Sequence, residues 1–168
     1  MARKLAFAFV TGSLLLATTT PAAAQREGAL PTDAKKLDGL LVQSQGICPV
    51  MGMDLTKMGG PVKAKIGQQT IFLCCKGCLG KQINQEHWAQ IQANLKTAQG
   101  ICPVRNVALG SEAVPVVVKG RTVYVCCDAG YCIKQVQAHP DKHLAIVDRL
   151  LKENLGRQAG DPGLRQQR

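Results

Sequence analysis

Aromatic and acidic residues are scarce in this sequence. Phenylalanine, tryptophan and tyrosine make up 4% of its 168 residues, so we do not expect a core built on large rings. Acidic residues number 11 against 21 basic ones, and no pair of carboxylates is arranged for acid–base catalysis. The sequence also lacks a glycine-rich phosphate loop and a nucleophile elbow. These absences predict a protein that is not an enzyme.

Long hydrophobic runs are absent beyond the N-terminus. There, Arg3 and Lys4 precede a mostly apolar stretch from Leu5 to Leu16, and small residues follow up to Ala24. This order is typical of a secretory signal peptide cleaved after Ala24, and its apolar part is too short to span a membrane. We therefore expect a signal peptide over residues 1–24, no transmembrane segment, and a secreted or periplasmic protein. An uncleaved anchor is the alternative.

Clustered positive charge is also missing, although the formal net charge is +10. The lysines are spread along the chain without a basic run and without aromatic residues between them. Nucleic-acid-binding segments usually show both features. We expect a solvated basic surface and no nucleic-acid partner.

The chain contains an internal repeat. The hexapeptide QGICPV begins at Gln45 and again at Gln99, and the segment TIFLCC from Thr70 matches TVYVCC from Thr122. Between these matches, Pro61-Val62 aligns by letter with Pro115-Val116 at the same offset as the hexapeptides. We interpret the sequence as a tandem duplication, with the first repeat over residues 47–98 and the second over residues 99–155.

Each repeat is expected to contain a Cys-Pro turn, a β-hairpin and a helix. Gly67 and Gly120 separate the apolar segments of the two hairpins. Gly46 and Gly100 are suitable helix stops, and Pro140 suits the first turn of the last helix. The sequence thus predicts an α+β fold, with a linker and leading helix at residues 25–46 and a disordered tail at residues 156–168. The apolar residues at helical spacing are Leu37, Leu40 and Leu41 in the leading helix, Ile83, Trp88, Ile91 and Leu95 in the middle helix, and Leu144, Ile146, Val147, Leu150 and Leu151 in the last helix.

Eight cysteines dominate the chemistry of the sequence. An even number in an exported protein is typical of a disulfide framework. Their grouping also suits a metal ion, because a turn that carries one sulfur and a later cluster at a helix start can surround it from two sides. In the first repeat the sulfur-bearing candidates are Cys48, Met51, Cys74, Cys75 and Cys78.

These motifs resemble a known group of domains. The turn CPVMGM from Cys48 to Met53, followed by FLCCKGC from Phe72 to Cys78, is similar to the YHS and TRASH heavy-metal-binding domains. Those domains have a CPVCGM-type turn and a later Cys-x3-Cys. The resemblance implies two small treble-clef-like units that handle metals such as copper and zinc. It makes Cys48, Cys74 and Cys78 the expected ligands, with Met51 where the family often has a cysteine.

Two further sulfur atoms of the first repeat have alternative roles. A thioether suits copper(I) better than zinc(II), so Met51 as a ligand would favour copper. Met51 could instead fill a gap in a small core, as we expect of Met53 and Met58. Cys75 is a spare thiol, since neighbours on a strand point to opposite faces and only a local bend would bring Cys74 and Cys75 to one ion.

The second repeat departs from this pattern. Arg105 replaces Met51, and a fixed cation disfavours a metal ion nearby. The later cysteines are also spaced more widely than in the first repeat. We expect either a degenerate metal site or a structural copy in which Cys102 forms a disulfide with one of the later three cysteines. The candidates for metal or disulfide here are Cys102, Cys126, Cys127 and Cys132.

Histidines are not expected to contribute ligands. His87, His139 and His143 are predicted to lie on helix surfaces. The CKGC segment is followed by Leu79 rather than histidine, which does not support attachment of c-type haem.

The sequence favours an exported heavy-metal-binding protein that holds copper(I) or zinc(II) for trafficking, sensing or storage. Its partners would be the metal ion and another exported metal-handling protein. Two alternatives stay open. One is a secreted structural or interaction module stapled by disulfides, and the other is a thiol–disulfide redox protein that uses Cys75 and Cys78 as its reactive pair.

Overall fold

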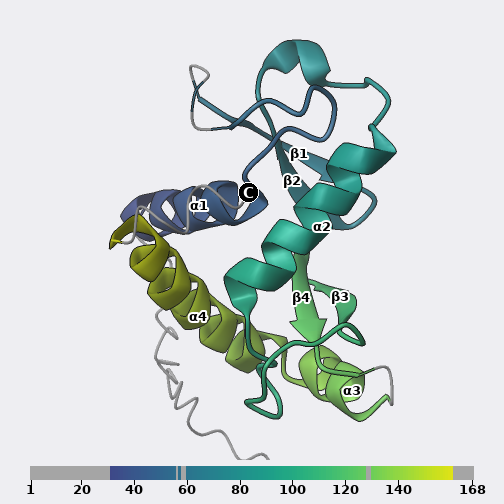
Figure 1. Ribbon diagram of the computed structural model, residues 1–168, viewed down its shortest axis with the longest axis vertical. Helices are drawn as coiled ribbons and strands as arrows, with labels where there is room; N and C mark the ends of the chain where they lie inside the picture. The colour runs from purple at the N-terminus through teal and green to yellow at the C-terminus, as the bar shows by residue number, and fades with distance from the viewer. Residues whose placement is uncertain (1–30, 56, 58–59, 128–129, 161–168) are drawn as a thin grey trace, which may run out of the picture.

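Helices and two-stranded sheets alternate along the chain (Figure 1). The computed structural model describes residues 31–160 except 56, 58–59 and 128–129. The predicted signal peptide, residues 25–30, Met58 and residues 161–168 lie outside the described residues. The elements are α1 (Pro31–Gln45), β1 (Val62–Ile66), β2 (Gln69–Leu73), the 3₁₀ helix η1 (Lys76–Cys78), α2 (Gln85–Gln99), β3 (Val114–Val118), β4 (Arg121–Val125), α3 (Tyr131–Ala138) and α4 (Pro140–Gly160).

The predicted α+β class and both hairpins are confirmed. Strands β1 and β2 pair antiparallel, as do β3 and β4, and each pair forms a separate two-stranded sheet. Gly67 has a φ of 56° in the first turn, and Lys119 and Gly120 have φ values of 47° and 76° in the second. Tight hairpin turns of this kind need positive φ angles, which explains the glycine in each.

The strand register corrects our alignment of the two repeats. Val62 lies opposite Leu73, and Val114 lies opposite Val125. The structural equivalent of Val62 is therefore Val114, not Val116, and the letter match of the two Pro-Val pairs is wrong by two residues. The second repeat has two residues fewer before its hairpin and two more after it.

The predicted helix limits are mostly confirmed. Gly46 and Gly100, with φ values of 79° and 68°, follow α1 and α2 directly, and Pro140 begins α4. The side chain of Asn84 caps α2 by accepting hydrogen bonds from the backbone N–H groups of Glu86 and His87.

Two predictions about helices were wrong. Helix α3 was not predicted, and α4 continues to Gly160, five residues into the predicted tail. Leu155 near the end of α4 is buried in the second core, which explains why the helix continues. None of the helices in the described residues is both long enough and apolar enough to cross a membrane.

Each repeat has its own hydrophobic core, and the three long helices connect them. Helices α1, α2 and α4 contact one another, and Leu41 of α1 packs against both cores (Figure 1). The first core contains Val42, Cys48, Leu55, Ile71, Phe72, Leu73, Cys74 and Cys78. The second contains Ala98, Cys102, Val116, Val118, Val123, Val125, Cys132, Val136, Leu144, Val147, Leu151 and Leu155.

The glutamine that opens each hexapeptide links the preceding helix to the hairpin. Gln45 Nε2 donates to the carbonyls of Ile47 and Phe72 at 2.9 and 2.7 Å, and its Oε1 accepts from the Phe72 N–H at 2.9 Å. Gln99 makes the same three bonds to Ile101 and Tyr124, at 2.9, 2.7 and 2.8 Å. Both glutamines are almost fully buried. The hexapeptide occurs twice because each repeat uses the same glutamine to fix its Cys-Pro turn against its hairpin.

Candidate metal centres

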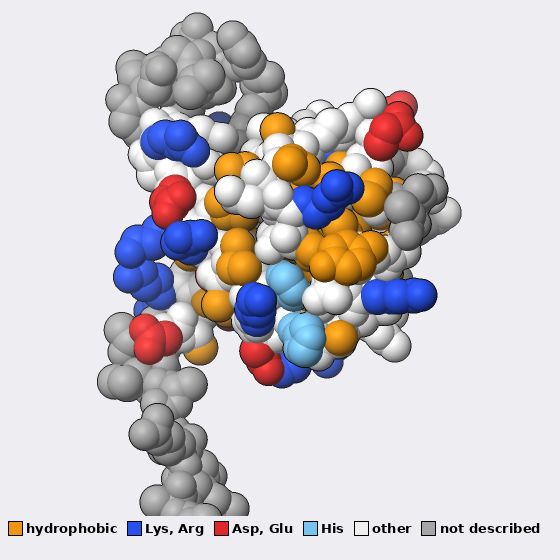
Figure 2. All heavy atoms as spheres, turned by 90° about the horizontal axis from the view of Figure 1, so that it is seen from below, with side chains coloured by type: hydrophobic (Ala, Val, Ile, Leu, Met, Phe, Trp, Pro, Cys, Tyr) orange, Lys and Arg blue, Asp and Glu red, His pale blue; other side chains and the backbone are white. Residues whose placement is uncertain are grey.

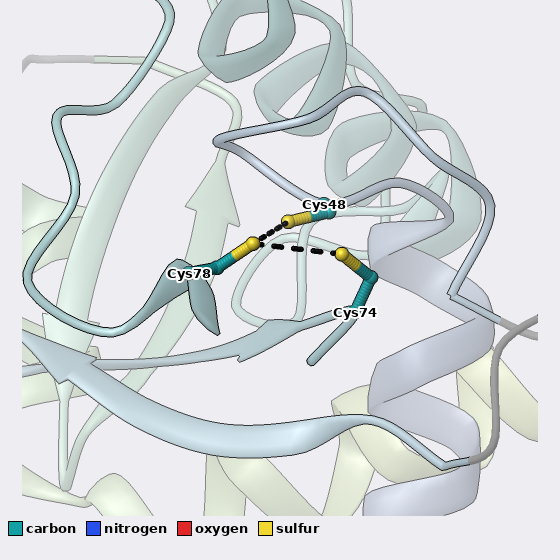
Figure 3. Close-up of side chains that lie close together, drawn as sticks. All are labelled: Cys48, Cys74 and Cys78. Atoms are coloured by element: carbon teal, nitrogen blue, oxygen red, sulfur yellow. Dashed lines mark hydrogen bonds between the residues drawn. The ribbon is translucent and has the colours of Figure 1, made fainter. Parts of the chain in front are cut away.

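Three thiols converge in the first repeat. Cys48 comes from the Cys-Pro turn, Cys74 directly follows β2, and Cys78 ends η1, and Figure 3 shows their side chains pointing toward one another. The three Sγ atoms all lie within 4.8 Å of one another. Cys78 Sγ is 3.8 Å from Cys48 Sγ and 3.6 Å from Cys74 Sγ. All three residues are at most 5% exposed.

The backbone of the Cys-Pro turn determines the position of Cys48. Its N–H donates to the Met53 carbonyl at 2.8 Å, and its carbonyl accepts from the Gly52 N–H at 2.9 Å. Gly52 has a φ of 67°, and a Cβ atom built there would lie 2.5 Å from Nε2 of His87. Only glycine fits this position, because both the backbone conformation and the histidine ring exclude a side chain.

The environment of Cys48 favours its thiolate. Burial alone raises the pKa of this thiol, but backbone N–H groups of Cys74, Met51 and Val50 donate to the sulfur, and the net result is a pKa below the ordinary value. Burial raises the pKa of Cys78 to about 12, with smaller contributions from the neighbouring thiols. Three buried thiolates without a cation would repel one another, so a bound cation would relieve this conflict.

Cys75 lies beside this group but not within it. Cys74 and Cys75 both lie in a bend directly after β2 rather than on the strand, and there Cys74 is buried and Cys75 is exposed. Cys75 Sγ is nevertheless 3.8 Å from Cys78 Sγ. Hydrogen bonding from the Cys78 thiol, followed by the Gly77 N–H, lowers the pKa of Cys75. The first repeat therefore has three buried thiols and one exposed thiol in contact with them.

Met51 does not belong to the core. Its side chain is 58% exposed and that of Met53 is 40% exposed, so the interpretation of these residues as core packing is wrong. Leu79, one residue beyond Cys78, is also exposed. These apolar side chains lie next to the ligand-bearing segments in the sequence but point at least partly to solvent.

The second repeat contains an equivalent group of thiols. Cys102, Cys126 and Cys132 also have Sγ atoms within 4.8 Å of one another, and the Cys126 and Cys132 sulfurs are 3.9 Å apart. Our expectation of a degenerate site is wrong in its geometry. The wider cysteine spacing does not separate the thiols, since Cys132 lies in α3 and its sulfur still reaches those of Cys102 and Cys126.

Arg105 takes the place of Met51 in the turn of the second repeat. Its side chain is exposed, and burial, which raises the pKa of Cys102, is outweighed by backbone N–H groups of Arg105, Val104 and Cys126 that lower it. Asn106, with a φ of 54°, replaces Gly52 in the turn, a conformation that asparagine tolerates. The position of Met51 and Arg105 thus acts on the thiol through its backbone in both repeats.

No cysteine is in a disulfide. All eight lie in the described part of the chain and all are thiols, so the predicted disulfide of Cys102 is not formed. Cys127 Sγ lies 3.9 Å from Cys126 Sγ, whereas the sulfur of Cys75, the equivalent thiol of the first repeat, lies 3.8 Å from that of Cys78.

One histidine differs from its predicted location. His143 is 4% exposed rather than on the helix surface, and its Nδ1 lies 3.2 Å from the Pro103 carbonyl. In the first repeat the equivalent carbonyl, that of Pro49, accepts from the Asn84 N–H at 3.0 Å. His139 is exposed and His87 is half-buried beside Gly52. Among the described residues, the two groups able to hold a metal contain cysteines only.

The surface around the second group is apolar and basic. Val107, at the end of the turn that begins with Cys102, and Tyr131, directly before Cys132, are 46% and 62% exposed. Figure 2 views the molecule from below and shows hydrophobic side chains gathered on this face, with lysine and arginine side chains around them. Acidic side chains are fewer on the same face.

We compared the chain with protein-family models, curated proteins and solved structures. No protein-family model, no curated protein and no solved structure matches this chain. The similarity to YHS and TRASH domains therefore depends on the motifs alone. The functional argument depends on the geometry of the two cysteine groups, which we call the first centre (Cys48, Cys74, Cys78) and the second centre (Cys102, Cys126, Cys132).

Proposed function

We propose that this protein is an exported metal-binding protein that holds one thiophilic ion, copper(I) or zinc(II), in each of its two centres. The observation that carries the proposal is the spacing of the thiols. An ion bound at 2.3 Å to tetrahedrally arranged sulfurs separates them by about 3.8 Å. Two Sγ–Sγ distances in the first centre are 3.6 and 3.8 Å, one in the second is 3.9 Å, and the other pairs lie within 4.8 Å.

The donor set favours copper(I). Three thiols without oxygen or nitrogen donors form a soft site, and copper(I) accepts three soft ligands. Zinc(II) in structural sites takes four ligands, so it would need a water molecule or a further side chain. Met51, which we considered as the fourth donor, is exposed. The buried position of the three thiols also suits a site that keeps a reactive ion away from water.

Export is proposed from the N-terminal sequence. The N-terminal pattern of Arg3, Lys4 and the apolar residues that follow supports a signal peptide. Thiols in an oxidising compartment form disulfides unless something holds them apart, and a bound ion would do so. A protein of this kind would carry or store its ion and exchange it with another exported metal-handling protein.

Metal titration of the purified, reduced protein tests the proposal. We expect two copper(I) ions per chain in competition with a calibrated chelator, and copper(I) should displace zinc(II) from both centres. Titration with a thiol reagent before and after metal loading should show that the thiols of the two centres no longer react once the ions are bound. Failure to bind either ion, together with loss of thiols to disulfides, would favour the disulfide-stapled alternative. Displacement of copper(I) by zinc(II) would contradict the choice of ion.

A further inference from the structure

We propose that Cys75 is the residue through which a metal ion reaches and leaves the first centre by ligand exchange. This inference rests on the proposed function. The three thiols of the centre are buried, with Cys48 fully inaccessible. Cys75 is exposed, and its sulfur lies 3.8 Å from that of Cys78. In the first repeat it is the thiol that contacts both the solvent and the centre.

The local backbone creates this arrangement. Cys74 and Cys75 lie in a bend directly after β2, where Cys74 is buried and Cys75 is exposed. Helix η1 then reverses the chain, with the Cys78 N–H donating to the Cys75 carbonyl at 3.2 Å, so that Cys78 returns beneath Cys75. A Cβ atom at Gly77 would lie 3.7 Å from the Cys75 sulfur. Glycine at this position leaves the sulfur uncovered, whereas a larger side chain would lie against it.

The exchange needs no oxidant or reductant. A bond between the ion and its donor ligand breaks as the ion bonds to the Cys75 sulfur, and the Cys75 proton passes to solvent or to the departing ligand. The ion then bonds to Cys78 and the two other thiols of the centre, whose protons leave to solvent. The bond to Cys75 breaks, and that sulfur takes up a proton. The ion keeps its oxidation state throughout.

Surrounding charge indicates the class of donor. Lys76 and Lys81 are exposed on either side of Cys78 in the sequence, and the described residues 74–85 contain no acidic residue. Metal ions carried by several thiolates form anionic complexes, which positive side chains attract. The first centre should therefore accept its ion from a negatively charged metal–thiolate complex.

The test compares Cys75→Ser with Cys127→Ser in the full-length mature chain. Cys127 is the matched control, because it occupies the equivalent position and contacts Cys126 of the second centre. Copper(I) is supplied as its complex with a chromophoric chelator, and both the affinity and the rates of uptake and release are measured. Both measurements are repeated in a Cys102→Ser background, in which only the first centre has all three thiols.

We expect Cys75→Ser to slow uptake and release at the first centre by about tenfold or more, which corresponds to about 1.4 kcal/mol in the barrier. The affinity should stay unchanged, because both rates fall together, and Cys127→Ser should leave the first centre unaffected. Lower affinity with faster release would overturn the inference by making Cys75 a permanent fourth ligand. Unchanged rates of uptake and release would also overturn it, because they would show that Cys75 takes no part in the transfer of the ion. Absence of copper binding in the unsubstituted protein would instead reject the proposed function, and the inference with it.

Discussion

The two repeats share a framework of hydrogen bonds but differ in the residues that surround their thiols. The glutamine bonds, the turn bonds and the helix-ending glycines agree, and corresponding distances differ by at most 0.2 Å. In contrast, Met51 corresponds to Arg105, Gly52 to Asn106 and Phe72 to Tyr124. The comparison shows that the centre depends on backbone positions, while the side chains around it are free to vary.

The last helix of each repeat adds to this framework. Asn94 of α2 donates to the Gln45 carbonyl at 3.0 Å, and Asn154 of α4 donates to the Ala98 and Gln99 carbonyls at 2.9 and 3.1 Å. Each asparagine thereby satisfies carbonyl groups at the end of the preceding helix. This role was not predicted, although both asparagines lie among apolar residues of a helical pattern.

The largest expected effect comes from removing the turn cysteine of each repeat. Cys48→Ser and Cys102→Ser should each reduce the bound copper from two ions to one, because each removes one of three buried ligands. If the second repeat were instead the structural copy considered from the sequence, Cys102→Ser would mainly lower stability and leave metal binding unchanged. Native mass spectrometry of the loaded variants decides between the two. Retention of both ions in Cys102→Ser would show that the second ion does not depend on Cys102, which contradicts the proposed second centre.

Removing the glutamine of either repeat should lower the free energy of unfolding. Gln45→Ala or Gln99→Ala leaves a buried N–H and buried carbonyls without partners, at a cost of about 2 to 4 kcal/mol. Urea denaturation of the metal-free variants measures the loss. Gln43→Ala is the matched control, because Gln43 is exposed on the same helix as Gln45. Equal stability of Gln45→Ala and Gln43→Ala would refute the framework role.

Alkaline pH should destabilise the metal-free protein. Burial raises the pKa of Cys78 and Cys132 to about 12 from an ordinary 9.0. The contribution of these two neutral thiols to the free energy of unfolding is fully present below about pH 9. It is lost as the pH rises toward 12, because the unfolded chain releases these protons at lower pH than the folded chain does. Thermal unfolding between pH 8 and 11 measures the decline.

The same pH series separates the two repeats. Burial also raises the pKa of Tyr124 to about 12, whereas Phe72 has no proton to release. Tyr124→Phe should therefore reduce the decline above about pH 10, the ordinary pKa of tyrosine. Metal loading should suppress the contribution of Cys78 and Cys132, since the bound ion keeps both thiols ionised. An identical pH profile with and without metal would contradict this assignment.

The smallest expected effect concerns Met51. Because its side chain is exposed, Met51→Leu should change the copper(I) affinity of the first centre by less than about threefold, which is about 0.7 kcal/mol. Competition against the chelator used for the unsubstituted protein measures it. A larger loss would mean that the thioether closes over the ion as a fourth ligand. That result would make the two centres unequal, since the guanidinium of Arg105, at the equivalent position, has no lone pair with which to bind a metal ion.

Local chemistry explains which parts of the fold could be predicted. The turns at Gly67 and Gly120 and the helix ends at Gly46 and Gly100 depend on positive φ angles that glycine adopts freely. Helix α3 was missed because it has eight residues and begins at Tyr131, after Gly130, which has no side chain to cap the helix. Its few apolar residues give little helical pattern.

The first centre was predictable because Cys48, Cys74 and Cys78 have a recognisable spacing. The second was not, since its hairpin is shifted by two residues against the letter match and only the strand register shows this. Similarly, the exposure of Met51 and the burial of His143 depend on packing between segments that are distant in sequence. No local pattern encodes such contacts.

The glutamine bonds also bear on how much of the strand edge of the first hairpin is left unpaired. A two-stranded sheet has an unpaired edge on each strand, and such edges can recruit strands from other molecules. On β2, Gln45 occupies the backbone groups of Phe72, and the Gly120 carbonyl accepts from the Thr70 N–H at 2.7 Å. The second hairpin and one glutamine thus cover alternate positions along the outer edge of the first hairpin. A small protein with two short sheets can in this way keep its strands from pairing with those of a neighbouring copy.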